Sequence, residues 1–364
     1  MLSIGYILLF CYGVFISISI WGWLKAVSQQ IIVFKKKGQG LDLDVIVPFR
    51  NEETNLKGLL MDISAQEKGS LEHIRFIFVD DHSEDEGRGV IASFEDKFAL
   101  ICIKNQGEGK KAALETAMAH CATDLVLFWD ADIRIGPSYF IGLNALDLKA
   151  IDMCILPVVP RLEGRFWQRY AVLDFLSLIG TTFSWAALRM PIMVNAANML
   201  ISRKYFQVDT AVSSGDDMFT LHRIKSMGGK VTSSLDRRLE VFTSMPADWN
   251  AFLDQRMRWA AKSSDYTDKH TLIIGWSMVL INSGLLLLMA YLLFIGLPQK
   301  ALQLFLFKSC ADLLFLLLVS MHFRLSSSLI IFPLAALVNM FMFPLIFIAS
   351  RTKSFAWKGR TFKK

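Results

Sequence analysis

The chain contains 364 residues, of which 53% are hydrophobic, and its mean hydropathy of +0.40 is too high for an ordinary soluble globule. The net charge of +6 does not indicate a nucleic-acid-binding protein, because the basic clusters flank uncharged apolar segments, as is typical beside membrane spans. The five cysteines form no close pair and show no metal-ligand spacing, which argues against a disulfide-stapled fold and suits a reducing compartment.

The first predicted element is the uncharged segment of residues 1–24. It is long enough to cross roughly 30 Å of hydrocarbon at about 1.5 Å per residue. It has no basic leader and no small-residue cleavage site before Lys25, so we expect a retained transmembrane anchor and not a cleaved signal. Residues 25–41, which include Lys35-Lys36-Lys37, are predicted to form a basic juxtamembrane linker.

Residues 42–270 have the mixed charge of a folded α/β domain. Short β-branched runs alternate with segments of helical spacing, such as residues 52–66 and 109–121. This alternation predicts a largely parallel sheet covered by helices on both faces. The predicted strands are residues 43–49, 74–79, 99–103, 124–129 and 195–202.

Polar clusters follow three of these strands, namely Pro48 to Glu52, Asp80-Asp81 and Asp130-Ala131-Asp132. Because ligands bind beyond the carboxyl ends of parallel strands, we expect the three clusters to converge. The carboxylates of Asp130 and Asp132 suit Mg²⁺ or Mn²⁺, which proteins commonly share with phosphate oxygens. A solvated turn is the alternative for this triplet, and Asp80-Asp81 either caps a helix or accepts hydrogen bonds from a nucleobase or ribose.

Two polar segments open predicted helices. Gly107 to Lys111 places Lys110 at a helix start, where it either contacts a diphosphate or is simply solvated. Ser213 to Asp217 opens another helix, whose dipole stabilises carboxylates in its first turn. Asp216 and Asp217 are therefore either capping residues or candidates for a general base, which must lie within hydrogen-bond distance of an acceptor hydroxyl.

The apolar segment of residues 166–190 raises the question of another membrane span. It contains Arg169 and Asp174, and a crossing here would separate Asp132 from the polar motifs downstream. We therefore expect an interfacial or buried helix pair in this segment, and another interfacial helix near residues 248–268.

The sequence Gln255-Arg256-Met257-Arg258-Trp259 lies in that second interfacial helix. The spacing of three puts Gln255 and Arg258 on one helical face, and Arg258 can bind phosphate oxygens in bidentate fashion. Trp259 offers a flat apolar surface on which a sugar ring or acyl chain can stack. Taken alone, the segment could also be an Arg-Trp belt before a membrane span.

Three apolar segments follow within residues 271–350, which we expect to form transmembrane or re-entrant helices. Residues 271–297 and 325–350 carry no charge, whereas residues 301–323 are interrupted by Lys308 and Asp312. These two residues lie four apart on one helical face and are predicted to pair with each other, facing neighbouring helices.

The tail of residues 351–364 carries six basic residues and conflicts with three trailing crossings. If the folded domain is cytoplasmic, three crossings place this tail outside, against the positive-inside trend. Either one trailing segment is re-entrant or interfacial, or the tail is external.

The ordered set of motifs between residues 42 and 262 resembles that of the membrane-bound family 2 glycosyltransferases, which have the GT-A fold. Architecturally the chain resembles the ceramide, hopanoid and carotenoid glycosyltransferases, and more distantly the processive polysaccharide synthases. The Trp357-Lys358-Gly359-Arg360 tail is also similar to that of several lipid-modifying members. The matching segments are VPFRNEE (47–53), VDDHSED (79–85), GKKAAL (109–114), DAD (130–132), GDD (215–217) and QRMRW (255–259).

The resemblance implies a role for each matching position. Pro48, Glu52 and the Asp80-Asp81 pair would line the nucleotide pocket, and Lys110 would approach the diphosphate. Asp130 and Asp132 would bind the sugar-nucleotide and the metal, with Asp132 the more direct ligand. Asp217 would be the base, although Asp216 stands where many relatives have Glu. Gln255, Arg258 and Trp259 would frame the diphosphate and the acceptor.

We therefore expect an inverting, metal-dependent transfer of a sugar from a nucleotide-sugar, a UDP-sugar by resemblance, to the hydroxyl of a membrane lipid. The expected setting is an integral protein of a bacterial inner membrane with a cytoplasmic catalytic domain and no nucleic-acid partner. A processive synthase of a poly-N-acetylglucosamine or hyaluronan type is the second hypothesis. A non-catalytic membrane scaffold that retains the fold is the third.

Overall fold

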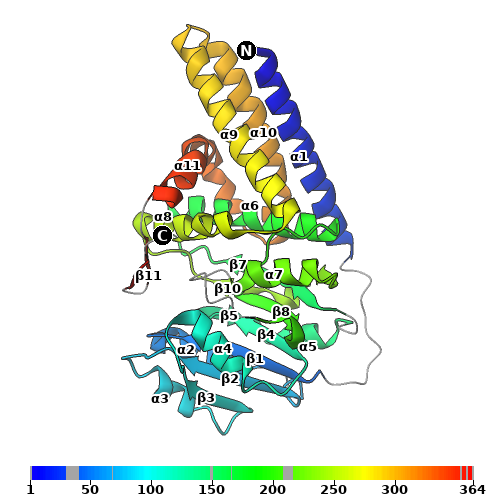
Figure 1. Cartoon of the computed structure of the whole chain (residues 1–364), viewed down its shortest axis with the longest axis vertical. Helices are drawn as coiled ribbons and strands as arrows, with labels where there is room; N and C mark the ends of the chain where they lie inside the picture. The colour runs from blue at the N-terminus through cyan, green and yellow to red at the C-terminus, as the bar shows by residue number, and fades with distance from the viewer. Residues whose placement is uncertain are drawn as a thin grey trace. The chain divides into compact units, whose positions relative to one another are not determined.

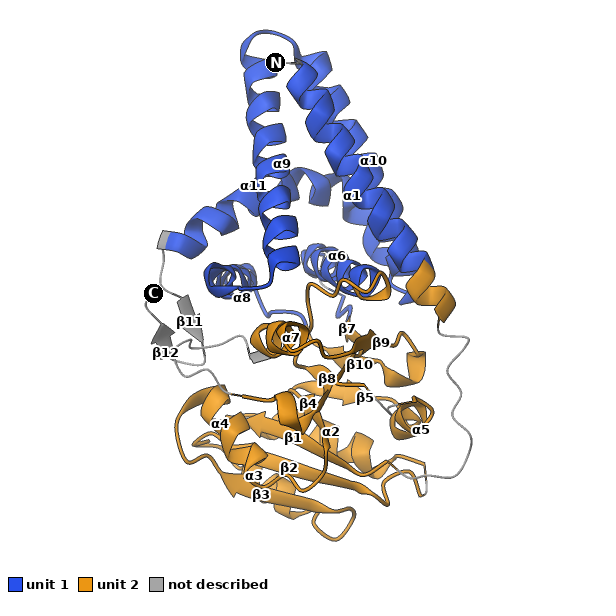
Figure 2. Ribbon diagram, turned by 45° about the vertical axis from the view of Figure 1, so that its right-hand side comes forward, with its two compact units in different colours: residues 1–24, 160–185, 245–364 blue, residues 25–159, 186–244 orange. Residues whose placement is uncertain are grey.

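The structure is a computed structural model, and the chain forms two compact units (Figures 1 and 2). The helical unit comprises residues 1–24, 160–185 and 245–364, and the sheet unit comprises residues 25–159 and 186–244. Within the predicted domain of residues 42–270, residues 160–185 and 245–270 join the helical unit, and these two stretches contain most of the predicted interfacial helices. The structure describes residues 2–29, 41–67, 69–147, 151–164, 166–207, 216–352, 355–357 and 360–362, and for residues 2, 216 and 352–362 only the backbone.

The sheet unit is built on a seven-stranded sheet of order β3-β2-β1-β4-β8-β6-β9. Four neighbouring strands, β3, β2, β1 and β4, run parallel, whereas β8 is antiparallel to both β4 and β6. This confirms the predicted α/β fold with a largely parallel sheet. The strands are β1 (Leu43–Phe49), β2 (Ile74–Asp80), β3 (Leu100–Lys104), β4 (Leu125–Trp129), β6 (Met153–Ile155), β8 (Asn198–Ser202) and β9 (Val231–Ser233).

Helices connect these strands, and a small second sheet has the order β5-β10-β7. The helices are α2 (Glu53–Ser64), α3 (Gly87–Ala92), α4 (Gly109–Met118), α5 (Tyr139–Asn144) and α7 (Asp216–Ser226), with short 3₁₀ turns η1 (Arg203–Tyr205) and η2 (Arg237–Leu239). The second sheet contains β5 (Ile133–Ile135), β7 (Val158–Pro160) and β10 (Val241–Thr243). From β1 the chain adds β2 and β3 on one side of the sheet, and then adds β4 on the other side of β1. The strand order therefore reverses between β1 and β4, and parallel sheets bind ligands at such a switch point.

The central strands of the sheet unit are buried on both faces, as β-branched runs between two helical layers should be. Val45, Ile46 and Val47 on β1 have no exposed surface. Asp44 is equally buried, but its carboxylate accepts hydrogen bonds from Arg75 (2.8 Å), from the Ala122 and Thr123 amides (2.7 and 2.9 Å) and from the Thr123 hydroxyl. Burial raises the pKa of Asp44, yet these donors outweigh it and lower the pKa overall.

The helical unit contains six α-helices among the described residues, and five stretches are long and apolar enough to cross a membrane. Three of them, α1, α9 and α10, lie side by side in both views (Figures 1 and 2). The others are α6 and residues 326–351. The helices are α1 (Leu2–Gln29), α6 (Gln168–Ala187), α8 (Trp249–Ala261), α9 (Lys269–Phe294), α10 (Pro298–His322) and α11 (Phe332–Thr352), with 3₁₀ turns η3 (Lys262–Asp265) and η4 (Ser326–Ile331) and strands β11 (Phe355–Trp357) and β12 (Arg360–Phe362).

The segment of residues 166–190 contains one continuous helix, α6 (Gln168–Ala187), and not the predicted helix pair. No proline interrupts residues 168–187, and the glycine within them, Gly180, lies where α10 approaches closely. A Cβ added to Gly180 would come within 2.6 Å of Val319 and 2.8 Å of the Phe315 ring. Most of α6 is buried, in agreement with the buried alternative predicted for this segment.

Lys308 and Asp312 form the predicted i,i+4 ion pair on α10, with the ammonium 2.8 Å from the carboxylate. Both side chains are largely buried, at 8% and 17% exposure. The Tyr12 hydroxyl of α1 donates a hydrogen bond to the same carboxylate, and the Lys308 ammonium lies 4.8 Å from the centre of the Tyr12 ring. The pair therefore joins α10 to α1.

Candidate functional site

The loops that follow β1 and β2 are joined by reciprocal hydrogen bonds. The Asn51 amide donates to the Ser83 hydroxyl (3.0 Å), and the Asn51 side-chain oxygen accepts from the Glu84 amide (2.8 Å). The Glu53 amide donates to the Asp85 carboxylate (2.8 Å). These bonds fix the backbone around the predicted site residue Glu52, which is half-buried. Sequence reasoning did not single out these linking side chains.

Asp80 and Asp81 are buried, with 3% and 4% of their surface exposed. Asp80 accepts a hydrogen bond from the Ser83 amide (2.8 Å), and Asp81 accepts from the Asn105 side chain (2.7 Å) and the Gly109 amide (2.8 Å). Both carboxylates therefore hold the loops that follow β2 and β3, whereas the N-cap positions of α3 and α4 are Glu86 and Glu108. The place of the two aspartates in a nucleotide pocket stays a prediction.

The loop before α4 is shaped around Gly109, which has a left-handed φ of 87° that favours glycine. The Asn105 side-chain oxygen accepts from the Gly107 amide (3.1 Å), and His82 Nε2 lies 2.8 Å from the Gly107 carbonyl. Lys110, the next residue, forms an ion pair with Asp130. The fold thus brings together two predicted site residues that are twenty positions apart.

Asp130 and Asp132 follow β4, the strand that pairs with β1 at the switch point. Partial desolvation and repulsion from Asp130 and Glu52 raise the pKa of Asp132 to about 6, and Lys110 acts in the opposite direction. Because the Asp132 side chain is exposed to solvent, the neighbouring carboxylates contribute more to this higher pKa than burial does. Four of the predicted site residues are therefore electrostatically coupled.

The oxygen donors at this position fit a hard divalent cation. Asp130, Asp132 and Glu52 crowd negative charge that such a cation would neutralise. Within the part of the chain that the structure describes, no three His, Cys, Asp or Glu side chains converge as a complete metal site. Proteins usually bind Mg²⁺ through one or two carboxylates, and phosphate oxygens and water molecules complete its coordination shell.

Two sets of polar contacts support the segment that carries these acids. The fully buried Asn198 of β8 accepts from the Tyr139 hydroxyl (2.6 Å) and donates to the carbonyls of Pro157 and Leu239 (both 2.9 Å). Its oxygen also lies 3.4 Å from the indole nitrogen of Trp129, the residue before Asp130. The sequence predicted a strand here but gave no sign of this hub.

The second support joins α2 to β5. The Arg134 guanidinium makes two hydrogen bonds of 2.5 Å to Asp62, which also accepts from the Ile135 amide (3.1 Å). Arg134 crosses α2 at Gly58, where an added Cβ would lie 3.2 Å from the guanidinium. This contact fixes the chain immediately after Asp132.

Asp216 and Asp217 open α7 in the sheet unit, as predicted. Asp217 is half-buried and accepts a hydrogen bond from the Met218 amide (2.8 Å). Residues 213–215 and the side chain of Asp216 lie outside the described part of the chain. The general-base assignment therefore stays a prediction.

The Gln255 to Trp259 motif lies on α8 in the helical unit, where Gln255, Arg258 and Trp259 are half-buried. The buried member is Arg256, whose guanidinium lies 2.5 Å from the Asp174 carboxylate of α6. Its carbon is 4.3 Å from the centre of the Trp259 ring. Arg256 thus packs against one face of Trp259. The only sign of this role in the sequence is Asp174, an acid within the apolar segment that forms α6.

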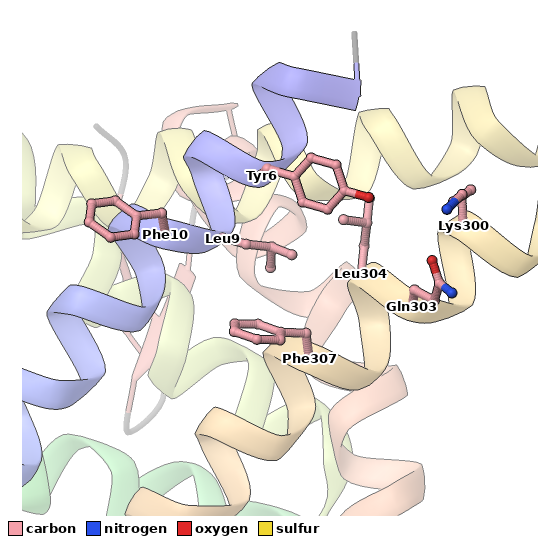
Figure 3. Close-up of a pocket in the computed structure, with 7 residues that line it drawn as sticks. All are labelled: Tyr6, Leu9, Phe10, Lys300, Gln303, Leu304 and Phe307. Carbon is pink, nitrogen blue, oxygen red and sulfur yellow. The ribbon is translucent and has the colours of Figure 1, made fainter.

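The helical unit also has an open groove of about 300 Å³ between α1 and α10 (Figure 3). Leu9, Leu304 and Phe307 contribute to its apolar wall, and Lys300 and Gln303 contribute polar groups. Its lining contains none of the predicted site residues.

Comparison with known proteins identifies related sequences. The chain is 28% identical over 120 residues to 4,4'-diaponeurosporenoate glycosyltransferase of Staphylococcus haemolyticus, covering 31% of each protein. It is 30% identical over 98 residues to undecaprenyl-phosphate 4-deoxy-4-formamido-L-arabinose transferase of Pseudomonas fluorescens, covering 26% of this chain and 29% of the relative. These matches span about a third of the relatives' lengths.

A solved structure extends the likeness to the whole fold. The mannosyltransferase of Pyrobaculum calidifontis, in complex with GDP-Man and Mn²⁺, superposes with a TM-score of 0.53 over 95% of this chain and 98% of that one. At 16% identity this likeness shows a shared GT-A fold.

Family models give the assignment. The model for glycosyl transferase family 2 matches residues 44–190, and that for glycosyl transferase family group 2 matches residues 125–348. Since the second match covers more than half of the chain, the protein belongs to the family 2 group of glycosyltransferases.

Proposed function

We propose that the protein transfers a sugar, with inversion, from a nucleotide-sugar to a membrane lipid. The observation that carries the proposal is the convergence of Glu52, Lys110, Asp130 and Asp132 at the carboxyl ends of β1 and β4. An acid-rich site with one lysine suits a metal-bound diphosphate, and the apolar helices suit a membrane acceptor.

On the donor side, Lys110 forms an ion pair with Asp130. A bound diphosphate would compete for Lys110, while Asp132 and Asp130 would hold Mg²⁺ or Mn²⁺. That cation would supply charge stabilisation for the departing diphosphate. Pro48, Glu52, Asp80 and Asp81 would line the nucleotide side, and we assign a UDP-sugar as the donor.

On the acceptor side, Asp217 would take the proton of the acceptor hydroxyl as its oxygen attacks the anomeric carbon. Gln255, Arg258 and Trp259 would contact the diphosphate and the acceptor. A lipid acceptor is supported by the names of the two bacterial relatives, which contain diaponeurosporenoate and undecaprenyl phosphate.

We place the catalytic domain, residues 42–270, on the cytoplasmic face of a bacterial inner membrane, where nucleotide-sugars are available. Residues 1–24 would serve as the anchor, 25–41 as the linker and 271–350 as further membrane helices. Residues 30–40 of that linker lie outside the described part of the chain.

The test uses membranes containing the full chain and a panel of labelled nucleotide-sugars, with GDP-mannose included. We expect label from a UDP-sugar in the organic extract, dependent on a divalent cation, and its loss in Asp132→Asn. Label in long water-soluble chains would instead indicate a polymerising synthase. Absence of transfer from every donor would reject the proposed reaction.

A further inference from the structure

We infer that residues 326–352 enter the membrane and return to the side they came from. The chain then crosses the membrane three times, through α1, α9 and α10. Its basic tail lies on the side of the membrane where α1 ends and α9 begins. This inference concerns membrane topology and does not depend on the proposed reaction.

The first argument is where α11 begins. Helices α9 and α10 are joined by only three residues, 295–297, and contact each other, so the end of α10 lies at the same end of the bundle as the start of α9. The end of α1 lies there too, because the Trp23 and His322 rings are 5.5 Å apart. η4 contacts α10 and follows it after three residues, so α11 also starts near this end.

The second argument is where α11 finishes. The Phe347 ring of α11 lies 5.4 Å from the Trp276 ring of α9. Trp276 is seven residues into α9, or about 11 Å along its axis, whereas Phe347 is fifteen residues into α11, or about 23 Å along that helix. A helix that ran beside α9 toward the far end would place Phe347 near α9 residues well beyond Trp276. The last turns of α11 therefore lie in the half of the bundle where α9 begins.

Further contacts hold this segment at the same end. The Arg169 guanidinium of α6 donates a hydrogen bond to the Ser327 carbonyl of η4 (2.7 Å), and α11 contacts α8, the helix that precedes α9. In Figure 2, α11 crosses α9 instead of running alongside it. The groove in Figure 3 involves the first turns of α1 and α10, at the opposite end of the bundle.

Local sequence explains the bend. Arg324 has a left-handed φ of 59°, the next turn is 3₁₀, and Pro333 stands at the second position of α11, where proline is tolerated. Pro344 within α11 removes one helical hydrogen bond. High hydropathy thus makes residues 326–351 a candidate span. The left-handed residue, the 3₁₀ turn and the prolines make the chain bend, so that α11 runs across the bundle.

The outer face of α11 fits the hydrocarbon of one leaflet. Its exposed large side chains recur at intervals of three or four residues and form one apolar stripe. They are Leu334, Leu337, Phe341, Leu345 and Ile348. By sequence, six basic residues follow within 351–364, and a returned tail would place them against anionic headgroups on the same side as Lys35-Lys36-Lys37.

The test compares three single cysteines in the full chain, on a background without the native cysteines, using an impermeant maleimide on sealed cells and on permeabilised cells. Glu95→Cys reports the sheet unit, Gln299→Cys the start of α10 and Lys363→Cys the tail. We expect Lys363→Cys to label together with Glu95→Cys and opposite to Gln299→Cys. Labelling of Lys363→Cys together with Gln299→Cys would overturn the inference.

A second measurement needs no substitution. An impermeant amine reagent on the native chain, read by mass spectrometry, compares Lys364 with Lys104 of β3 and Lys300 of α10. Modification of Lys364 in parallel with Lys104 supports the returned tail, and modification in parallel with Lys300 contradicts it.

Discussion

The sheet unit and the helical unit position their polar groups in different ways. In the sheet unit, loops after neighbouring strands supply backbone donors, as when Asp81 accepts from the Gly109 amide. In the helices, backbone donors are already used, so polar side chains from two helices pair, as Arg256 does with Asp174 and Tyr12 with Asp312. Site geometry therefore depends on strand order in one unit and on a few side-chain pairs in the other.

The largest expected effect tests the acid assigned as base in the sheet unit. Asp217→Asn removes proton acceptance and should lower kcat about 10²- to 10⁴-fold, the usual contribution of a general base. Asp216→Asn is the matched control and should retain most activity. A greater loss in Asp216→Asn than in Asp217→Asn would exchange the two roles.

The next effect tests the buried hub of the sheet unit. Asn198→Leu leaves the Tyr139 hydroxyl and the Pro157 and Leu239 carbonyls without this partner, each at a cost of about 1–3 kcal/mol. Hydrogen exchange of β4 and β8 peptides should accelerate by at least about 100-fold. Asn195→Ala, which removes one bond to the Ala197 amide, is the milder control. Equal exchange in both variants would show that the hub does not stabilise these strands.

A smaller effect tests the pair that holds α8. Arg256→Met leaves Asp174 without its cation and removes the guanidinium from Trp259, and we expect KM to rise roughly 10-fold with a lesser change in kcat. Arg256→Lys keeps the charge and should recover part of this loss. Arg169→Met, which breaks the bond of α6 to η4, is the control. Equal kinetics in Arg256→Met and wild type would show that Trp259 is positioned without Arg256.

Sequence patterns predicted the sheet unit better than the helical unit. Strands β1 to β4, and the acids that follow β1, β2 and β4, were predicted because β-branched runs and the acids at their ends are local signals. The three-residue strands β5, β6, β7, β9 and β10 are too short to show a period. Asn198 and Arg256 were missed because their importance lies in partners distant along the chain. For residues 326–351, hydropathy predicted the length of the apolar segment but not the direction in which its helix runs relative to α9.

The smallest effect concerns Asp132 and runs opposite to the usual behaviour of a paired carboxylate. Its pKa of about 6 in the fold exceeds the ordinary value of 3.8, so the folded chain binds more protons and this residue costs stability as pH rises from about 4 to 6. Because the side chain is exposed, screening should keep the cost below about 1 kcal/mol. Asp132→Asn should therefore unfold at a slightly higher temperature than wild type at pH 7.5 in EDTA, with a smaller difference at pH 5. Added Mn²⁺ and UDP should stabilise wild type more than the variant. A variant less stable than wild type in EDTA at pH 7.5 would mean that the neighbouring carboxylates do not repel Asp132, and the case for a cation at this position would lose its electrostatic support.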